Sequence, residues 1–205
     1  MNTNWMMDID DGGLLSFMNS FVLFYNQRNG TLFMKDGVSV YDLWKVFGIT
    51  EEKVVEEIKE FYKSPEFERL PASSGALDLL SRISQQGNLA YAITARPAYT
   101  RYSTESNLRL NFGKYAPEVI FSKPYSSLLD PGKKFKTKAE ICLEKQVGFV
   151  TEDSVEHANA LGESGITVFL LTQPWNVNCT RIHPNVTRVE SLSDVLKMKN
   201  LFTSE

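Results

Sequence analysis

The chain has 205 residues, 42% of them hydrophobic, which is enough to bury one core and an elaboration of it. Its 22 Lys and Arg against 25 Asp and Glu give a formal charge of -3, which excludes a broad cationic surface for a nucleic-acid polymer. No apolar run reaches the roughly 18 residues of a membrane span, and two cysteines are too few for a disulfide framework. We therefore expect a soluble, cytoplasmic protein with Cys142 and Cys179 as small core residues.

Short apolar runs alternate with helical patterns along most of the chain. The runs predict buried strands at residues 5–7, 89–93, 118–121, 147–150 and 166–171. Between them, apolar residues at helical spacing predict helices at residues 75–86, 99–112, 138–145 and 155–164. In the first of these helices Leu77, Leu80 and Ile83 are expected to face inward. This alternation indicates the α/β class, with a Rossmann-like, doubly wound parallel sheet. A short final helix is expected after Ser191.

Residues 14–71 interrupt this alternation, because they carry helical signals without a convincing buried strand. We predict that they form a small helical cap, inserted after the first strand into a core made of residues 1–13 and 72–205. Ser39 has capping-box spacing for one helix, which Gly48 ends, and Thr50 caps a second. Glycine or proline residues at both joints of the cap are typical of a hinge.

Polar side chains gather at the ends of the predicted strands. Asp8 and Asp10 follow the first strand, Thr94 follows the second, and Glu152 and Asp153 follow the run at 147–150. An open parallel sheet binds ligands in the crevice beyond the carboxyl ends of its strands, so we expect these residues to meet there. Carboxylates from separate strands suit Mg²⁺, which takes oxygen ligands and keeps water and substrate phosphate in its shell.

This set of residues favours phosphoryl transfer through a covalent intermediate. With charge neutralised by the cation, the Asp8 carboxylate can attack phosphorus and form an aspartyl phosphate. Asp10 lies on the same side of the extended chain and can protonate the leaving oxygen, then activate the hydrolytic water. Thr94 and the residues after it, Ala95 and Arg96, can bind phosphate at a helix N-terminus. Lys138 adds a positive charge. Its spacing to Asp153 favours it over the competing lysines at positions 133, 134 and 136.

These motifs resemble those of the haloacid dehalogenase-like hydrolases over nearly the whole chain. The resemblance is carried by DIDDG at 8–12, ITARP at 93–97, Lys138 and TEDS at 151–154. Further matches resemble the 5'(3')-deoxyribonucleotidase branch of that superfamily: YDLWKVFGI at 41–49, KAEIC at 138–142, EDSVEHA at 152–158 and QPWN at 173–176. The resemblance implies a magnesium-dependent enzyme with a small helical cap that dephosphorylates nucleoside monophosphates.

The resemblance also implies roles for single residues. Asp8 would be nucleophile and metal ligand, and Asp10 would be the acid and base that binds metal through its backbone carbonyl. Thr94 and Lys138 would hold phosphate, while Asp153 completes the metal site with Glu152 in support. The chain departs from the family at Gly12, where Thr or Val is usual, and Gly13 follows it. We expect this departure to shift the register and loosen the loop.

For several residues the sequence leaves two roles open. Arg96 either touches phosphate or pairs with an acidic neighbour. Four aromatic residues of the cap could stack a base, although aromatic residues at helical spacing are more often core; they are Phe17, Phe21, Tyr41 and Trp44. Trp175 is expected to anchor its loop, with a role at the rim of the site as the other reading. His157 and His183 are expected at the surface, since neither has a second ligand at metal-binding spacing.

The expected partner is a small phosphorylated substrate, and a nucleoside monophosphate fits the resemblance. A homodimer is compatible with the sequence, which does not determine the oligomeric state. Three rival functions exist: a phosphatase for another small ester such as a sugar phosphate, a phosphorylation-controlled receiver module, and an inactive homologue acting as a binding partner. A receiver carries its acceptor aspartate on a middle strand, and the intact acidic set argues against an inactive homologue.

Overall fold

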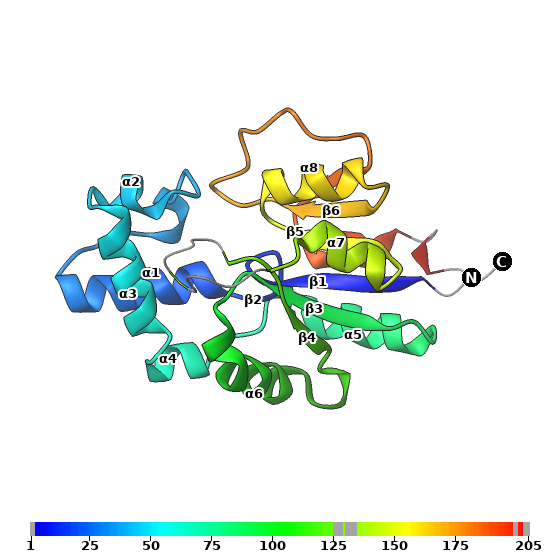
Figure 1. Cartoon of the computed structure of the whole chain (residues 1–205), viewed down its shortest axis with the longest axis horizontal. Helices are drawn as coiled ribbons and strands as arrows, with labels where there is room; N and C mark the ends of the chain where they lie inside the picture. Colours follow the sequence, from blue (N-terminus) through cyan, green and yellow to red (C-terminus); the bar gives the residue numbers. More distant parts are fainter. Residues whose placement is uncertain (1–2, 125–128, 130–134, 199–200, 203–205) are drawn as a thin grey trace.

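A parallel sheet forms the centre of the molecule. The computed structural model describes residues 3–124, 129, 135–198 and 201–202. Within this part, seven strands pair in the order β4-β3-β1-β5-β6-β7, with β2 beside β1 and every strand pairing parallel (Figure 1). The strands are β1 (Asn4–Asp10), β2 (Gly13–Leu15), β3 (Ala90–Thr94), β4 (Glu118–Phe121), β5 (Val147–Glu152), β6 (Thr167–Leu171) and β7 (Val186–Val189). The predicted α/β sheet is therefore confirmed. Strands β2 and β7 were not predicted from the sequence.

Helices cover both faces of this sheet. Apolar side chains of β1 point alternately to the two faces, and each face is buried against helices. Met6 packs with residues of α7 and α8, whereas Trp5 and Met7 belong to the core shared with α5, α6 and α9 (Figure 1). These helices are α5 (Ala76–Gln85), α6 (Arg101–Phe112), α7 (Lys138–Glu144), α8 (Val155–Glu163) and α9 (Leu192–Lys197); short 3-10 turns are η2 (Ala98–Thr100) and η3 (Gly113–Tyr115). No helix in the described ranges is long and apolar enough to cross a membrane.

Two details of the predicted core are wrong. In α5, Leu79, Leu80 and Ile83 face inward, but Leu77 is 45% exposed because it lies on the outer side of that helix. Cys142 is buried as predicted, whereas Cys179 is exposed, since it lies in the loop between β6 and β7.

Residues 14–71, here named the helical insert, gather at one end of the molecule (Figure 1, left). They form α1 (Phe17–Asn29), η1 (Lys35–Gly37), α2 (Leu43–Phe47), α3 (Glu51–Phe61) and α4 (Pro65–Glu68). Thr50 caps α3 by accepting from the Lys53 amide, and Gly48 ends α2 in the left-handed conformation, both as predicted. The predicted start at Ser39 is wrong, because the chain becomes helical only after Asp42.

The two joints of the insert run side by side. The Ser16 amide donates to the Pro71 carbonyl at 2.9 Å, and the Ser73 amide donates to the Leu14 carbonyl at 2.8 Å. Leu15 and Ala72 form an antiparallel bridge between these bonds. The insert is thus attached through two adjacent segments, and it lies beyond the carboxyl end of β1, where the sequence predicts the site (Figure 1).

Candidate functional site

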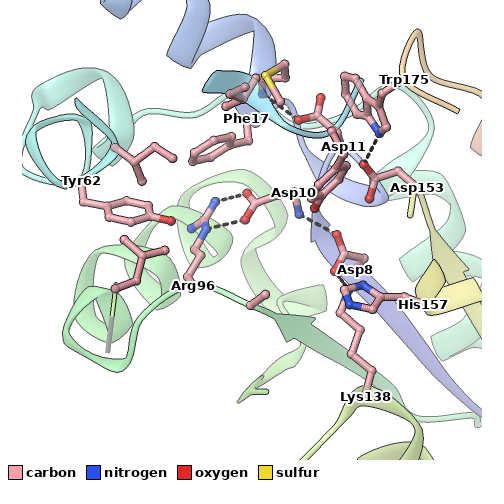
Figure 2. A pocket seen from close by; sticks show the side chains of 16 residues that line it. Asp8, Asp10, Asp11, Phe17, Tyr62, Arg96, Lys138, Asp153, His157 and Trp175 are labelled. Atoms are coloured by element: carbon pink, nitrogen blue, oxygen red, sulfur yellow. Dashed lines mark hydrogen bonds and ion pairs between the residues drawn. The ribbon is translucent and has the colours of Figure 1, made fainter. Parts of the chain in front are cut away.

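The two aspartates of the first motif lie at the crevice of the sheet. Strand β1 lies between β3 on one side and β5 on the other, so the order of strands along the chain changes direction across the sheet at β1. The carboxyl end of β1 is therefore the topological switch point, where open α/β sheets bind ligands. Asp8 and Asp10 project on the same side of β1, and the Asp10 amide donates to Asp8 Oδ2 at 3.1 Å. Asp8 is 5% exposed and lies near Asp153 (Figure 2). The carboxylate of Glu152, at the end of β5, lies beside both of them.

Lys138 is the lysine that reaches Asp8. It is the first residue of α7, whose start is fixed by a capping box between Thr137 and Glu140. Its ammonium forms ion pairs with Asp8 Oδ1 and, at 2.6 Å, with Glu152 Oε2. Burial alone would lower the pKa of Lys138, but these two carboxylates outweigh burial and raise it. Of the competing lysines, the one at position 136 pairs with a glutamate at the surface, and those at 133 and 134 lie outside the described residues.

Three carboxylates at this point form a group that could hold a cation. Ligand atoms of Asp8, Glu152 and Asp153 lie within 4.8 Å of one another, and all three residues are buried. Burial raises the pKa of Asp8 and of Asp153 well above the usual value, with Glu152 adding to the rise at Asp153, so a cation beside them would favour their ionised forms.

The charge balance of the site fits a divalent cation. Five acidic side chains meet three basic ones in the described part of the site: Asp8, Asp10, Asp11, Glu152 and Asp153 against Lys35, Arg96 and Lys138. Two negative charges remain, which Mg²⁺ would balance, and oxygen is its preferred ligand. Both oxygens of Glu152 already have partners within the protein. Lys138 pairs with Oε2, and the Asp153 and Ser154 amides donate to Oε1. Burial would raise the pKa of Glu152, but Lys138 lowers it.

The loop after β6 orients Asp153. Trp175 Nε1 donates to Asp153 Oδ2 at 2.9 Å (Figure 2), and Asn176 Nδ2 donates to the Asp153 carbonyl at 2.8 Å. Trp175 also lines the pocket above the carboxylates. Both predicted readings of Trp175 therefore apply, since it anchors the loop and lies at the rim of the site.

Thr94, Ala95 and Arg96 lie at the end of β3. The Thr94 hydroxyl accepts from the Arg96 amide at 3.0 Å and is buried beneath the site, whereas Ala95 and Arg96 line the pocket. The Arg96 guanidinium binds both oxygens of Asp10 (Figure 2), with Nε 2.8 Å from Oδ2. Of the two roles expected for Arg96, the structure thus shows the ion pair with an acidic neighbour.

Asp11 is a residue of the site that was not predicted from the sequence. Its carboxylate is buried and accepts from the Met18 amide at 2.6 Å, and Lys35 of the insert pairs with it at 3.0 Å. Burial raises the pKa of Asp11, and Lys35 opposes that rise. The positive φ of 55° at Asp11 is rare for a residue other than glycine, and the acidic run at 8–11 is the only sequence signal for it.

The double glycine makes the first motif compact. A Cβ atom at Gly12 would lie 2.7 Å from Asp8 Cβ, and one at Gly13 would lie 2.5 Å from Thr151 Oγ1. Strand β2 begins at Gly13 and pairs with β1 in the register of Asp8 with Gly13. The expectation of a loosened loop is therefore wrong, because close packing against Asp8 and Thr151 requires glycine at both positions.

The opposite side of the pocket comes from the insert and is apolar. Phe17 and Tyr41 line it, as predicted for two of the four cap aromatics. The core alternative holds for the other two, because Phe21 is fully buried inside the insert and Trp44 packs against the hydrophobic core. Six further residues that line the pocket were not predicted from the sequence: Met18, Leu43, Ile58, Tyr62, Leu129 and His157. The pocket has a cavity volume of about 90 Å³.

His157 and Tyr62 add polar atoms to the pocket, His157 from α8 and Tyr62 from the insert. The His157 side chain is 39% exposed, as expected for a surface residue, and it also lines the pocket, with Nδ1 3.8 Å from Glu152 Oε1. Burial and the nearby Asp10 carboxylate raise the pKa of Tyr62, so its phenol stays protonated and can donate a hydrogen bond toward a ligand.

Solved structures with a similar fold are hydrolases, and they include hydrolases of the haloacid dehalogenase (HAD) family. A HAD family hydrolase from Deinococcus radiodurans R1, with bound phosphate and sodium, has a TM-score of 0.64 and 14% identity, over 100% of this chain and 99% of that chain. The magnesium-bound HAD-hydrolase YfnB from Bacillus subtilis has a TM-score of 0.55 and 16% identity, over 97% and 99%. A hydrolase from Streptococcus pneumoniae TIGR4 has a TM-score of 0.56 and 21% identity, over 86% and 96%.

These similarities concern the fold. No protein-family profile matches the chain, and no curated protein matches its sequence. At identities of 21% and below, the likeness establishes the architecture and leaves the activity to be argued from the site. The chain has the fold of the HAD-superfamily hydrolases, as the sequence resemblance implies.

Proposed function

We propose that this protein is a magnesium-dependent phosphomonoester hydrolase that acts through an aspartyl phosphate on Asp8. The observation that carries the proposal is the buried cluster in which Asp8 meets Lys138, Glu152 and Asp153 while Asp10 lies beside it. A nucleophile, a proton carrier, a cation for phosphate and a metal-binding group thus share one edge of the sheet.

Asp8, Asp153 and Glu152 would hold Mg²⁺, which supplies positive charge against the phosphate and the developing transition state. In the first step the Asp8 carboxylate attacks phosphorus, the bond to the leaving oxygen breaks, and Asp10 gives its proton to that oxygen. In the second step a water molecule gives a proton to Asp10 and attacks phosphorus, which releases inorganic phosphate and restores the Asp8 carboxylate. Lys138 stays beside Asp8 and stabilises negative charge on the phosphoryl group in both steps.

The proposed substrate is a nucleoside monophosphate. The insert presents aromatic rings to the pocket, with Phe17, Tyr41 and Tyr62 on its side and Trp175 at the rim. Flat rings of this kind favour a flat, weakly polar leaving group such as a nucleoside. The resemblance of residues 41–49 and 173–176 to deoxyribonucleotidases supports the same choice.

A smaller phosphate ester is the second candidate, and the cavity volume favours it. About 90 Å³ is below the 300–1,000 Å³ that is usual for small-molecule pockets, so a nucleotide requires the insert to move outward. The YfnB structure reveals interdomain movement in a protein of this fold, and the paired joints of the insert here suit a hinge. We therefore propose that the insert acts as a movable cap.

The experiment is phosphate release from a panel of nucleoside monophosphates and sugar phosphates, with Mg²⁺ and after its removal by a chelator. We expect Mg²⁺-dependent turnover, with kcat/KM highest for a nucleoside monophosphate. A preference for sugar phosphates would select the second candidate. No metal-dependent release from any ester would reject the phosphatase.

A further inference from the structure

Hydrogen bonds to other side chains of the protein fix the Arg96 guanidinium in place. Arg96 is 2% exposed, and its guanidinium binds Asp10 through Nε and Nη2 while Nη1 donates to Thr104 Oγ1 at 3.0 Å. Asp10 thus faces a planar fork that binds both of its oxygens, which fixes the plane of the carboxylate as well as its distance. A phosphate ligand at this position would have to break that fork.

The insert closes over the guanidinium from the other side. The Arg96 guanidinium carbon lies 4.7 Å from the ring centroid of Phe67 in α4 and 5.9 Å from that of Phe17 in α1. Both rings belong to the insert, whereas Thr104 belongs to α6 of the sheet domain. Arg96 is therefore clamped between the two parts of the molecule, and a cation between aromatic faces is stabilised there. Figure 2 shows Phe17 and Tyr62 on the side of Arg96 that faces the insert.

From this geometry we propose that Arg96 is a positioning residue for Asp10, and that the insert controls the position of Asp10 through the rings of Phe17 and Phe67. The inference rests on the proposed function, because Asp10 matters only where a proton moves. A carboxyl group that carries its proton on one oxygen still accepts from the guanidinium through the other. Both arms of the fork therefore orient the ionised Asp10, one arm still orients it when it carries the proton, and outward movement of the insert would release it.

A double-mutant cycle with Arg96→Lys and Asp10→Asn tests the first part, using p-nitrophenyl phosphate as substrate and inorganic phosphate as inhibitor. Lysine keeps the charge but not the fork, so we expect Arg96→Lys to lower kcat about 10- to 100-fold. The inhibition constant of inorganic phosphate should stay within about twofold of wild type, and the substitution should have little effect in the Asp10→Asn background. Arg101→Lys, on the exposed side of α6, is the matched control and should leave kcat unchanged.

The same cycle contains the outcome that overturns the proposal. If Arg96 binds phosphate, Arg96→Lys weakens inhibition by phosphate at least tenfold and lowers kcat equally in the wild-type and Asp10→Asn backgrounds. Thr104→Val removes the hydrogen bond from Arg96, together with a longer one to Thr100, at nearly constant volume, so it gives a milder test should Arg96→Lys misfold. Thr104→Val should lower kcat only when Asp10 is present, and equal losses in both backgrounds would also reject the positioning role.

Phe67→Leu tests the second part, because it removes an aromatic face from Arg96 and keeps apolar volume in α4. We expect a lower kcat, unchanged inhibition by phosphate and no further loss in the Asp10→Asn background. Equal losses in both backgrounds would show that the ring acts on the fold alone and would reject control by the insert. Absence of turnover by the wild type would instead overturn the phosphatase and, with it, the role of Arg96.

Discussion

The two sides of the pocket are built from opposite kinds of side chain. The sheet side carries the ionisable groups of Asp8, Asp10, Lys138 and Asp153, from strand ends and from the start of α7. Asp8 pairs with Lys138, Asp10 pairs with Arg96, and Asp153 accepts a hydrogen bond from Trp175. The insert side is mainly apolar, with contributions from Phe17, Leu43, Ile58 and Tyr62. In the proposed reaction the sheet side would act on the phosphate and on the leaving oxygen, whereas the insert side would meet the rest of the leaving group. Reaction type and substrate choice would then depend mainly on different parts of the chain.

The largest effect should follow a change on the sheet side at the nucleophile. Asp8→Asn keeps the shape of the side chain but removes the charge that attacks phosphorus, so kcat should fall on the order of 10⁴-fold or more for every substrate. Asp78→Asn, on the exposed side of α5, is the control and should leave kcat unchanged. Comparable turnover by Asp8→Asn and wild type would remove Asp8 from its role.

Gly13→Ala should disturb the same side through packing. The added Cβ would lie 2.5 Å from Thr151 Oγ1 and 3.1 Å from the Asp8 carbonyl, so the buried Thr151 side chain or the backbone beside it has to shift. We expect a loss of about 1–3 kcal/mol in the free energy of unfolding, together with reduced kcat. Denaturant titration and steady-state kinetics measure the two effects.

Gly37→Ala is the matched control for this change, because a Cβ at Gly37 meets no atom within 4 Å. A combination of Gly13→Ala with Thr151→Ala should recover part of the loss, since it removes the nearest clash. Wild-type stability and activity in Gly13→Ala alone would contradict the requirement for glycine.

Trp175→Phe should weaken metal binding without a general effect on the fold. Phenylalanine keeps an aromatic ring beside Lys35 and Tyr41 but loses the N–H that orients Asp153. Loss of such a partner typically costs 10- to 100-fold in metal affinity, and we expect a change in that range for Mg²⁺ by calorimetry. Trp44→Phe, away from the carboxylates, serves as control. Equal Mg²⁺ affinity in wild type and Trp175→Phe would show that the hydrogen bond has no such role.

A change on the insert side should be smaller and should depend on the substrate. Tyr62→Leu removes a ring and a phenol next to the leaving group, so the ratio of kcat/KM between a nucleoside monophosphate and a sugar phosphate should change by about tenfold. Tyr62→Phe separates the effect of the phenol from that of the ring. A uniform loss for both substrates would mean that the two sides of the pocket are less independent than their composition indicates.

The sheet side could be predicted from the sequence because its residues follow from local rules. Buried strands of a parallel sheet end at one edge, so apolar runs followed by Asp8, Thr94 and Asp153 locate the crevice without knowledge of packing. Strand β7 escaped prediction because Thr187 and Arg188 interrupt its apolar residues at the sheet edge. Strand β2 has three residues, too few for a periodic signal.

The insert side was predicted less well because its contacts depend on how helices pack. Helical spacing marks Phe17 and Phe21 equally, yet only the first faces the pocket and the second is buried among other rings. Tyr62 follows the last turn of α3 and has no motif of its own. The fork between Arg96 and Asp10 joins residues 86 positions apart, and spacing alone could not choose between its two readings.

The central claim is that Asp8 accepts the phosphoryl group, and the most direct measurement is to trap that intermediate. Excess enzyme with Mg²⁺ is mixed with p-nitrophenyl phosphate, quenched in acid at short times, digested and examined by mass spectrometry, with Asp8→Asn alongside. The account predicts one phosphoryl group on Asp8 that forms and decays within a turnover and is absent from the variant. A phosphoryl group on another residue, or turnover by Asp8→Asn at the wild-type rate, would contradict it.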